Sequence, residues 1–150
     1  MSDLTDLFDL WWEMQTSHNG FDAIWYSPKK REESRPIWME HWQNAIGDPN
    51  FIIFVAIDRA QVIGMVKAAI TDRPRLLQNE MKVIAVENAI VTDRFRKQGI
   101  FTKLMNLVTE EGKLRGAKAM KLSVFNSNPA TLAYQRLGFS VHELGLIKYL

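Results

Sequence analysis

The sequence predicts a mixed α/β fold in one domain of 150 residues. Apolar residues at helical spacing mark two segments before residue 47 and another after residue 99, whereas runs of branched apolar residues typical of strands lie between and after them. The expected order is two helices, three strands, and then helix, strand, helix and strand. Such an order is typical of a sheet covered by helices.

Two helices are expected in the first fifty residues. One face of the first carries apolar side chains at residues 4, 7, 8, 11 and 14, and Ser2 is its candidate N-cap. Residues 16–35 are polar and irregular. The second helix is predicted to begin at Pro36, because proline is favoured at the first helical position, and to stop by Gly47.

The strands follow. The runs 51–57 and 62–70 form a predicted hairpin, residues 71–80 a loop, and residues 81–91 the central strand. After the helix that ends near Gly116 we expect a strand over 118–125. Asn128 can cap a short helix with Pro129 at its first position, and residues 139–150 are expected to hold one or two closing strands.

The central stretch Val83–Met105 is the most informative. Its strand is apolar on both faces except for Glu87 and Asn88, as expected for a strand covered on both sides. A basic loop containing Arg94, Arg96 and Lys97 then opens a helix at Gln98–Gly99. Free N–H groups at a helix N-terminus attract phosphate. A phosphorylated cofactor beside a buried carboxylate is indicated, although a solvated turn and a structurally paired Glu87 remain alternatives.

Composition narrows the function classes. There is no cysteine, which excludes disulfides, thiolate metal sites and a cysteine nucleophile. The acidic N-terminus does not resemble a signal peptide and no apolar run reaches 18 residues, so a cytoplasmic protein without a membrane partner is expected. Residues 1–50 carry nine acids and four bases, whereas residues 92–121 carry eight bases and three acids. The pattern favours a small polyanion over nucleic acid as the partner.

Two motifs resemble those of the GNAT superfamily of N-acyltransferases. Residues 96–101, RKQGIF, are similar to its acyl-CoA-binding signature, with Phe101 at a position usually held by a small residue. The sequence ATLAY from Ala130 to Tyr134, followed by LGF from Leu137, is similar to a second signature of the family. With Gly64 and the Glu87–Asn88 pair, the resemblance covers residues 51–150.

The resemblance implies a mostly antiparallel sheet with helices on both faces and two strands that splay at the acyl-CoA site. It implies acetyl-CoA as acyl donor and no metal. The implied cofactor contacts are the pyrophosphate loop and the splayed strand, together with the asparagines near the second motif: Arg96, Lys97, Gln98, Gly99, Ile100, Phe101, Thr102, Ala89, Ile90, Val91, Asn126 and Asn128.

The same resemblance suggests Glu87 as the base for the amine, on the strand face of Ala89 and Val91, and Tyr134 as the acid for the departing thiolate. A tyrosine packed under the sheet is the alternative for Tyr134. Phe101 can point into the core or toward the cofactor. His18 and His41 are only candidates for contact with the substrate, because a lone histidine on a helix is usually structural or solvated.

The expected activity is transfer of acetyl from acetyl-CoA to a primary amine, small molecule or peptide, by direct attack in a ternary complex. A catalytically inactive acyl-CoA-binding module and, less favoured, a nucleic-acid-binding protein are the alternatives. The amine is not identified by the sequence, and either a monomer or a homodimer fits it.

Overall fold

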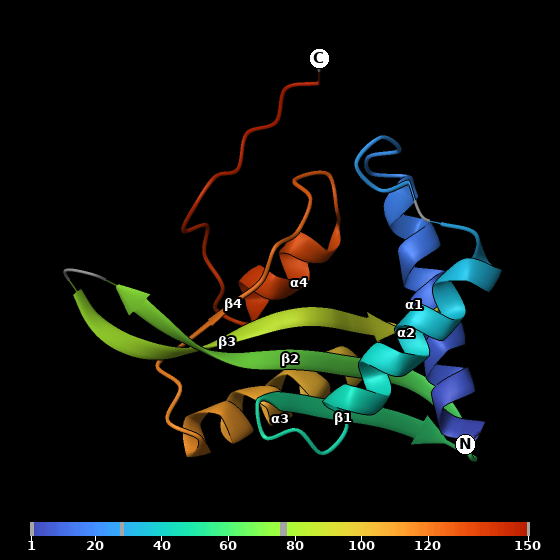
Figure 1. Cartoon of the computed structure of the whole chain (residues 1–150), viewed down its shortest axis with the longest axis horizontal. Helices are drawn as coiled ribbons and strands as arrows, with labels where there is room; N and C mark the ends of the chain where they lie inside the picture. Colours follow the sequence, from blue (N-terminus) through green and yellow to red (C-terminus); the bar gives the residue numbers. More distant parts are fainter. Residues whose placement is uncertain (1, 28, 76–77, 150) are drawn as a thin grey trace.

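The computed structural model describes residues 2–27, 29–75 and 78–149. In this part of the chain the elements are two helices, a hairpin, a third strand, a further helix, a short strand and a short helix (Figure 1). They are α1 Ser2–Asn19, α2 Arg31–Ala45, β1 Phe51–Asp58, β2 Gln61–Arg75, β3 Gln78–Val91, the 3-10 turn Asp93–Phe95, α3 Ile100–Leu114, β4 Ala119–Lys121 and α4 Ala130–Arg136. The predicted α/β class is confirmed.

The strands form one sheet in the order β1-β2-β3-β4, with β1, β2 and β3 antiparallel and β4 parallel to β3. The hairpin between β1 and β2 turns through Arg59 and Ala60, which both have positive φ angles of 46° and 65°. Positive φ at both loop positions matches the right-handed twist of the strands in a two-residue hairpin. The predicted hairpin and its position are therefore correct.

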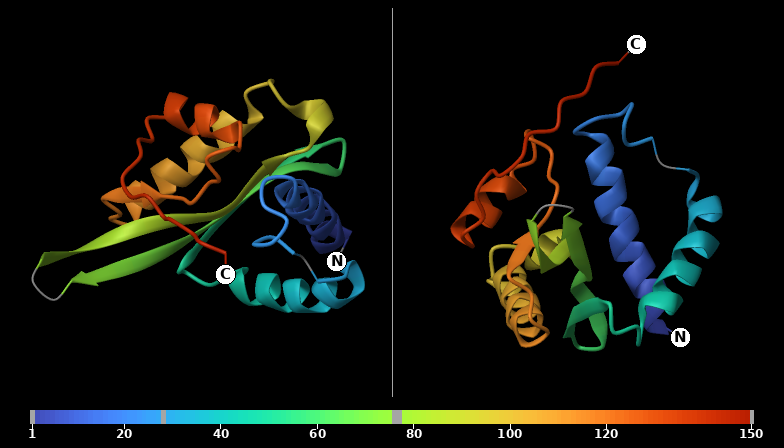
Figure 2. Two further views of the ribbon diagram at one scale, coloured as in Figure 1. Left: turned by 90° about the horizontal axis from the view of Figure 1, so that it is seen from above. Right: turned by 60° about the vertical axis from the view of Figure 1, so that its left-hand side comes forward.

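Each face of the sheet supports its own core, and helices cover both faces (Figure 2). On one face α1 and α2 pack Phe8, Trp38 and Trp42 against Met65 and Ile90. The other face packs against α3, and its buried residues belong to β1, β2, β3 and α3: Ile52, Val66, Ala68, Ile84, Val91, Leu104, Met105 and Val108. A sheet covered on both faces explains why β2 and β3 are nearly continuous in apolar residues.

Helix α2 begins at Arg31, so the prediction of a start at Pro36 was wrong. The carbonyl of Lys30 accepts hydrogen bonds from the N–H groups of Glu33 and Ser34, which places the first turn five residues earlier. Glu32 and Glu33 stabilise this turn, because negative charge is favourable at a helix N-terminus. Pro36 lies inside the helix, near enough to its start to be tolerated.

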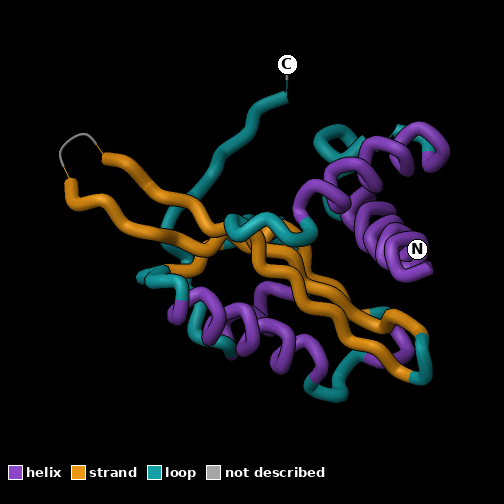
Figure 3. The backbone as a smooth tube through the Cα atoms, turned by 60° about the horizontal axis from the view of Figure 1, so that its bottom comes forward, coloured by secondary structure: helices purple, strands orange, loops and turns teal. Residues whose placement is uncertain are grey.

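The predicted loop over residues 71–80 is largely strand. Thr71, Asp72 and Arg73 pair with Val83, Lys82 and Met81, and the two strands form an arm that extends beyond the rest of the sheet (Figure 3). The tip, residues 76 and 77, lies outside the described residues. Polar residues indicated a loop here, but a two-stranded arm exposed to solvent also accepts them.

Two further predictions near the C-terminus were wrong. Of the strand predicted over residues 118–125, only Ala119–Lys121 forms a strand, β4. Residues 139–149 contain no strand and run as an extended, exposed segment (Figure 1). A hydrogen bond from the Tyr149 hydroxyl to the Asp22 carboxylate connects this segment to the chain after α1. Leu144 and Leu146 are solvent-exposed there, so apolar composition alone did not produce a strand.

The contact between α3 and β3 leads to a stability prediction. A Cβ atom at Gly112 would lie 1.9 Å from Ile84 Cδ1 and 2.8 Å from its Cγ1, and Ile84 is buried. Gly112→Ala should therefore destabilise the protein by about 1–3 kcal/mol, as overpacking does. Adding Ile84→Val, which removes Cδ1, should recover part of the loss. Denaturant midpoints of the three variants measure this, and simple additivity would contradict the proposed contact.

Candidate active site

A β-bulge in β3 determines which way its polar side chains face. Lys67 of β2 lies opposite Asn88, but the next residue, Ala68, lies opposite Val86, so Glu87 is the extra residue. Two consecutive residues at a bulge share one face of the strand. The carboxylate of Glu87 contacts Lys67 on the face of α1 and α2, whereas Ala89 and Val91 pack on the face of α3.

This arrangement corrects the expectation that Glu87 shares a face with Ala89 and Val91. Simple alternation along the strand predicts the same face, but the bulge shifts the alternation by one residue. Glu87 and Ala89 nevertheless line the same cleft, because the cleft lies at the edge of β3 where both faces meet.

The Glu87 carboxylate is bound by a buried lysine. Lys67 is fully buried in the centre of β2, and its ammonium contacts Glu87 Oε2 and lies 3.0 Å from His41 Nε2 on α2. The ring of Phe51 lies 4.3 Å from the same nitrogen. A buried ammonium is very costly unless it is paired, so Glu87 and His41 are the groups that make this position of Lys67 tenable.

A cleft of about 260 Å³ opens where β3 loses its neighbour. Strand β4 pairs with β3 only from Val83 to Ala85, and beyond this point residues 122–125 diverge from β3. The expected splay is therefore present. The cleft is lined on the β3 side by Val86, Glu87 and Ala89, and on the opposite side by Tyr134 of α4 together with residues 122–125, Asn128 and Ala130.

Tyr134 lies on α4 with its ring packed edge-on against Phe101 at 5.4 Å and Phe139 at 5.7 Å. Burial raises the pKa of the Tyr134 phenol above its ordinary value, so the hydroxyl keeps its proton at neutral pH. The contact with Tyr134 also shows that Phe101 points into the core on the α3 side. The bulky residue at this position therefore leaves the loop backbone uncovered.

The loop before α3 has the conformation expected for anion binding. Gly99 precedes the helix with φ 79°, Lys97 has φ 60°, and no side chain caps the first turn. The N–H groups of Ile100, Phe101 and Thr102 are in the first turn, where a helix leaves its donors without intrahelical partners. Lys97 and Gln98 are exposed beside them.

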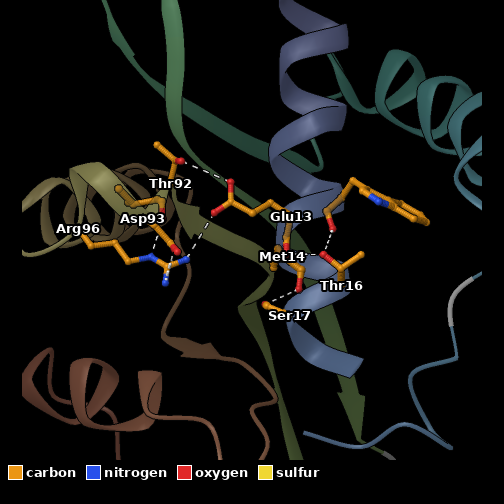
Figure 4. Close-up of polar contacts among 9 residues, drawn as sticks. Glu13, Met14, Thr16, Ser17, Thr92, Asp93 and Arg96 are labelled. Atoms are coloured by element: carbon orange, nitrogen blue, oxygen red, sulfur yellow. Dashed lines mark hydrogen bonds and ion pairs between the residues drawn. The ribbon is translucent and has the colours of Figure 1, made fainter. Parts of the chain in front are cut away.

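Arg96 is held by the protein itself (Figure 4). Its Nε donates to the Val91 carbonyl at 2.9 Å, and its guanidinium lies 2.7 Å from Asp93 and 3.8 Å from Glu13 of α1. The side chain therefore shapes the loop and joins it to α1. A role for Arg96 in contacting the cofactor directly stays a prediction.

The remaining predicted residues divide by burial. The side chains of Ile90 and Val91 are buried in opposite cores, which leaves only their backbone available to a ligand. Asn128 lines the cleft, and its Oδ1 accepts a hydrogen bond from the N–H of Ala130, as its predicted capping role requires. Asn126 is exposed and does not line the cleft.

Sequence reasoning did not single out Lys67, although a signal was present: it is the only charged residue in the apolar run VIGMVKAAI. Nor did it indicate a second cleft of about 430 Å³, which lies between α2 and the sheet. Its lining includes His41, Glu87 and Asn88, so Glu87 lies where the two clefts approach one another.

An aromatic cluster joins the end of α1 to the wall of the first cleft formed by residues 122–125. Rings of His18, Phe21, Tyr26 and Phe125 pack against one another with centroids 5.1–6.5 Å apart. Burial lowers the pKa of His18, which keeps its ring neutral at pH 7. Among the described residues no cluster of three His, Asp or Glu side chains is placed to hold a metal ion. In the same residues, every helix falls short of the length or apolarity of a membrane span.

The family is decided by a match to the model of the acetyltransferase (GNAT) family over residues 4–139. The chain belongs to this family. An uncharacterized N-acetyltransferase of Methanocaldococcus jannaschii is 29% identical over 143 residues, which are 95% of this chain and 58% of that protein. The chain thus spans little more than half the length of that curated relative.

Solved structures share the fold of this GNAT chain. A mutant form of the BH1408 protein of Bacillus halodurans has a TM-score of 0.89 at 17% identity, covering 99% of this chain and 94% of that one. The aminoglycoside N-acetyltransferase AAC(6')-Iy, bound to a bisubstrate analogue of CoA and acetylneamine, has a TM-score of 0.72 at 18% identity. The match covers 100% of this chain and 92% of that one. At these identities the likeness concerns the fold alone.

Proposed function

We propose that this chain transfers acetyl from acetyl-CoA to a primary amine by direct attack in a ternary complex. One observation carries the proposal. The splay of β3 from residues 122–125 opens a cleft that is lined by a carboxylate, Glu87, and by a protonated phenol, Tyr134. A base and an acid in one cleft are what an amine and a thioester need.

The cofactor would enter from the side of α3 and α4. Its pyrophosphate would accept hydrogen bonds from the backbone N–H groups of Gly99, Ile100, Phe101 and Thr102, with Lys97 adding positive charge. The pantetheine arm would follow the backbone of residues 89–91, which lacks a strand neighbour on the cleft side. Asn128, on the opposite wall, is placed to contact the same arm.

The chemistry follows from the positions of the two side chains. The amine nitrogen attacks the thioester carbon, and a free N–H group of β3 stabilises the oxyanion that forms. Glu87 takes the proton that the nitrogen loses. The carbon–sulfur bond then breaks, and the Tyr134 hydroxyl donates its proton to the sulfur. The chain has no cysteine to carry the acetyl group, which favours direct attack.

The test is product formation with a panel of amines: glucosamine 6-phosphate, an aminoglycoside, spermidine, phenethylamine and a peptide with a free N-terminus. Release of CoA together with an acetylated product supports the proposal. Binding of acetyl-CoA without turnover of any amine would support the alternative of a catalytically inactive acyl-CoA-binding module.

Two glycines provide a matched test of the cofactor loop. Gly99 and Gly116 flank α3, both have φ near +80°, and nothing lies within 4 Å of a Cβ atom at either position. Alanine at each should cost about 1–2 kcal/mol of stability, because side chains disfavour this conformation. Only Gly99→Ala should weaken acetyl-CoA binding in calorimetry on folded protein. Equal affinities in the two variants would contradict the assigned phosphate site.

Glu87→Gln tests the base. General-base contributions are typically about 10²–10⁴-fold, so turnover near pH 7 should fall by about that factor. The loss should shrink at high pH, where more of the amine is already neutral. Because the change also removes the charge that pairs with Lys67, melting temperatures must accompany the rates. A loss that is the same at every pH would assign Glu87 a structural role.

Tyr134→Phe tests the acid. A thiolate with an ordinary pKa near 8.5 leaves readily, so protonation of the CoA sulfur contributes less to the rate than activation of the amine. The loss of turnover in Tyr134→Phe should therefore lie toward the low end of the range of about 10²–10⁴-fold. Acetyl-CoA affinity should be nearly unchanged, since the ring still packs against Phe101 and Phe139. Undiminished turnover would remove Tyr134 from the mechanism.

A further inference from the structure

The side chain of Lys67 is buried completely, whereas the residues that it joins are accessible. Glu87 is 38% exposed and lines both clefts, and His41 is exposed on α2 and lines the second cleft. The lysine nitrogen lies between them, in contact with Glu87 Oε2 and 3.0 Å from His41 Nε2. The three side chains thus form a continuous chain of contacts from the candidate base to the surface.

The chemistry of these groups determines where the hydrogens lie. An ammonium group has three donors and no acceptor, so a hydrogen bond from Lys67 requires that His41 Nε2 be the acceptor. His41 is then neutral and carries its proton on Nδ1. Among the described residues that line the second cleft, the remaining charged group is Lys29, which adds no proton acceptor.

The proposed substrates would change the access of Glu87 to water. With acetyl-CoA and the amine in the first cleft, the part of the carboxylate that faces this cleft would be covered, whereas the ion pair with Lys67 would remain. The proton that Glu87 receives from the amine must nevertheless reach solvent before the next turnover. Lys67 and His41 offer a path that begins at the buried ammonium and reaches the surface at the second cleft, where His41 is exposed.

Resting on the proposed function, we propose that Lys67 and His41 relay the amine proton from Glu87 to solvent. Lys67 donates a proton to His41 Nε2, and the protonated Glu87 returns one to the lysine nitrogen. His41 releases its Nδ1 proton to water, which leaves the Nε2–H tautomer. The exposed ring then turns away from Lys67, gives the Nε2 proton to water and takes one proton from water at Nδ1 before it returns to the lysine. One proton leaves the protein, and all three groups return to their starting charges.

The first experiment reads the tautomer of His41 and needs no amine. Imidazole nitrogen shifts of the three histidines are measured by NMR with His41 assigned from His41→Ala. The relay requires the Nδ1–H tautomer in the wild type and a change toward Nε2–H in Lys67→Met. An Nε2–H tautomer in the wild type would overturn the relay.

The second experiment uses chemical rescue. His41→Ala should lower the turnover of acetyl-CoA with the fastest amine of the panel by about 10²-fold, the low end for proton-transfer groups, with the KM for acetyl-CoA unchanged. Added imidazole should restore product formation, measured as acetylated amine, and should not accelerate the control Gln43→Ala, whose changed side chain is exposed on the same helix. A loss that imidazole does not restore, or no loss, would overturn the relay.

The third experiment tests whether Lys67 acts through Glu87. Lys67→Met should slow turnover, but Lys67→Met combined with Glu87→Gln should be no slower than Glu87→Gln alone, because groups that act as a unit are not additive. Additive losses would contradict the relay. If Lys67→Met does not fold, His41→Ala and its rescue by imidazole carry the test. A wild type that binds acetyl-CoA but acetylates no amine would defeat the proposed function and the relay together, whereas normal turnover with failed rescue would defeat the relay alone.

Discussion

The pairing of one extra residue in β3 with a buried lysine of β2 is the constraint on which the candidate site depends. The bulge brings Glu87 and Asn88 to one face, and the ammonium of Lys67 lies opposite them in the otherwise apolar stretch 62–70 of β2. Neither feature is favourable by itself, since a bulge interrupts the ladder and an unpaired buried ammonium is costly. Together they fix the position of a carboxylate at the edge of the sheet.

The rest of the site is arranged around this edge. Beyond Ala85 the strand has lost its β4 neighbour, so the backbone on that side of β3 borders the cleft without a strand partner. Tight packing of α3 against Ile84 at Gly112 sets the position of that helix along β3, and hence the position of its N-terminus. Arg96 then connects the loop to α1 through Glu13, and it also pairs with Asp93 within the loop. The edge of β3 that carries Glu87 and the loop proposed to bind the cofactor are thereby held in one arrangement.

Much of this could be predicted from local patterns. Apolar periodicity and turn residues identified the hairpin, the central strand, α3 and the capping asparagine Asn128, and two short motifs identified the family. Features that depend on how strands and side chains pair in three dimensions could not be predicted from these local patterns. The bulge is visible only in the register between β2 and β3, and Lys67 has meaning only once Glu87 and His41 are seen beside it. The same limit explains the errors at residues 71–80 and 139–149, where composition was taken to decide between strand and loop.

The bulge also affects how this strand is compared with its relatives. Along β3 the side chains alternate in one phase up to Val86 and in the opposite phase from Asn88 onward, because the extra residue shifts the count by one. A protein with a regular strand at this place would match one half of β3 and be out of phase with the other. Aligning such a pair without a one-residue gap would equate a residue of the α3 core with one that faces α2. Whether a related strand presents its side chains as this one does therefore depends on the number of its residues as much as on their identity.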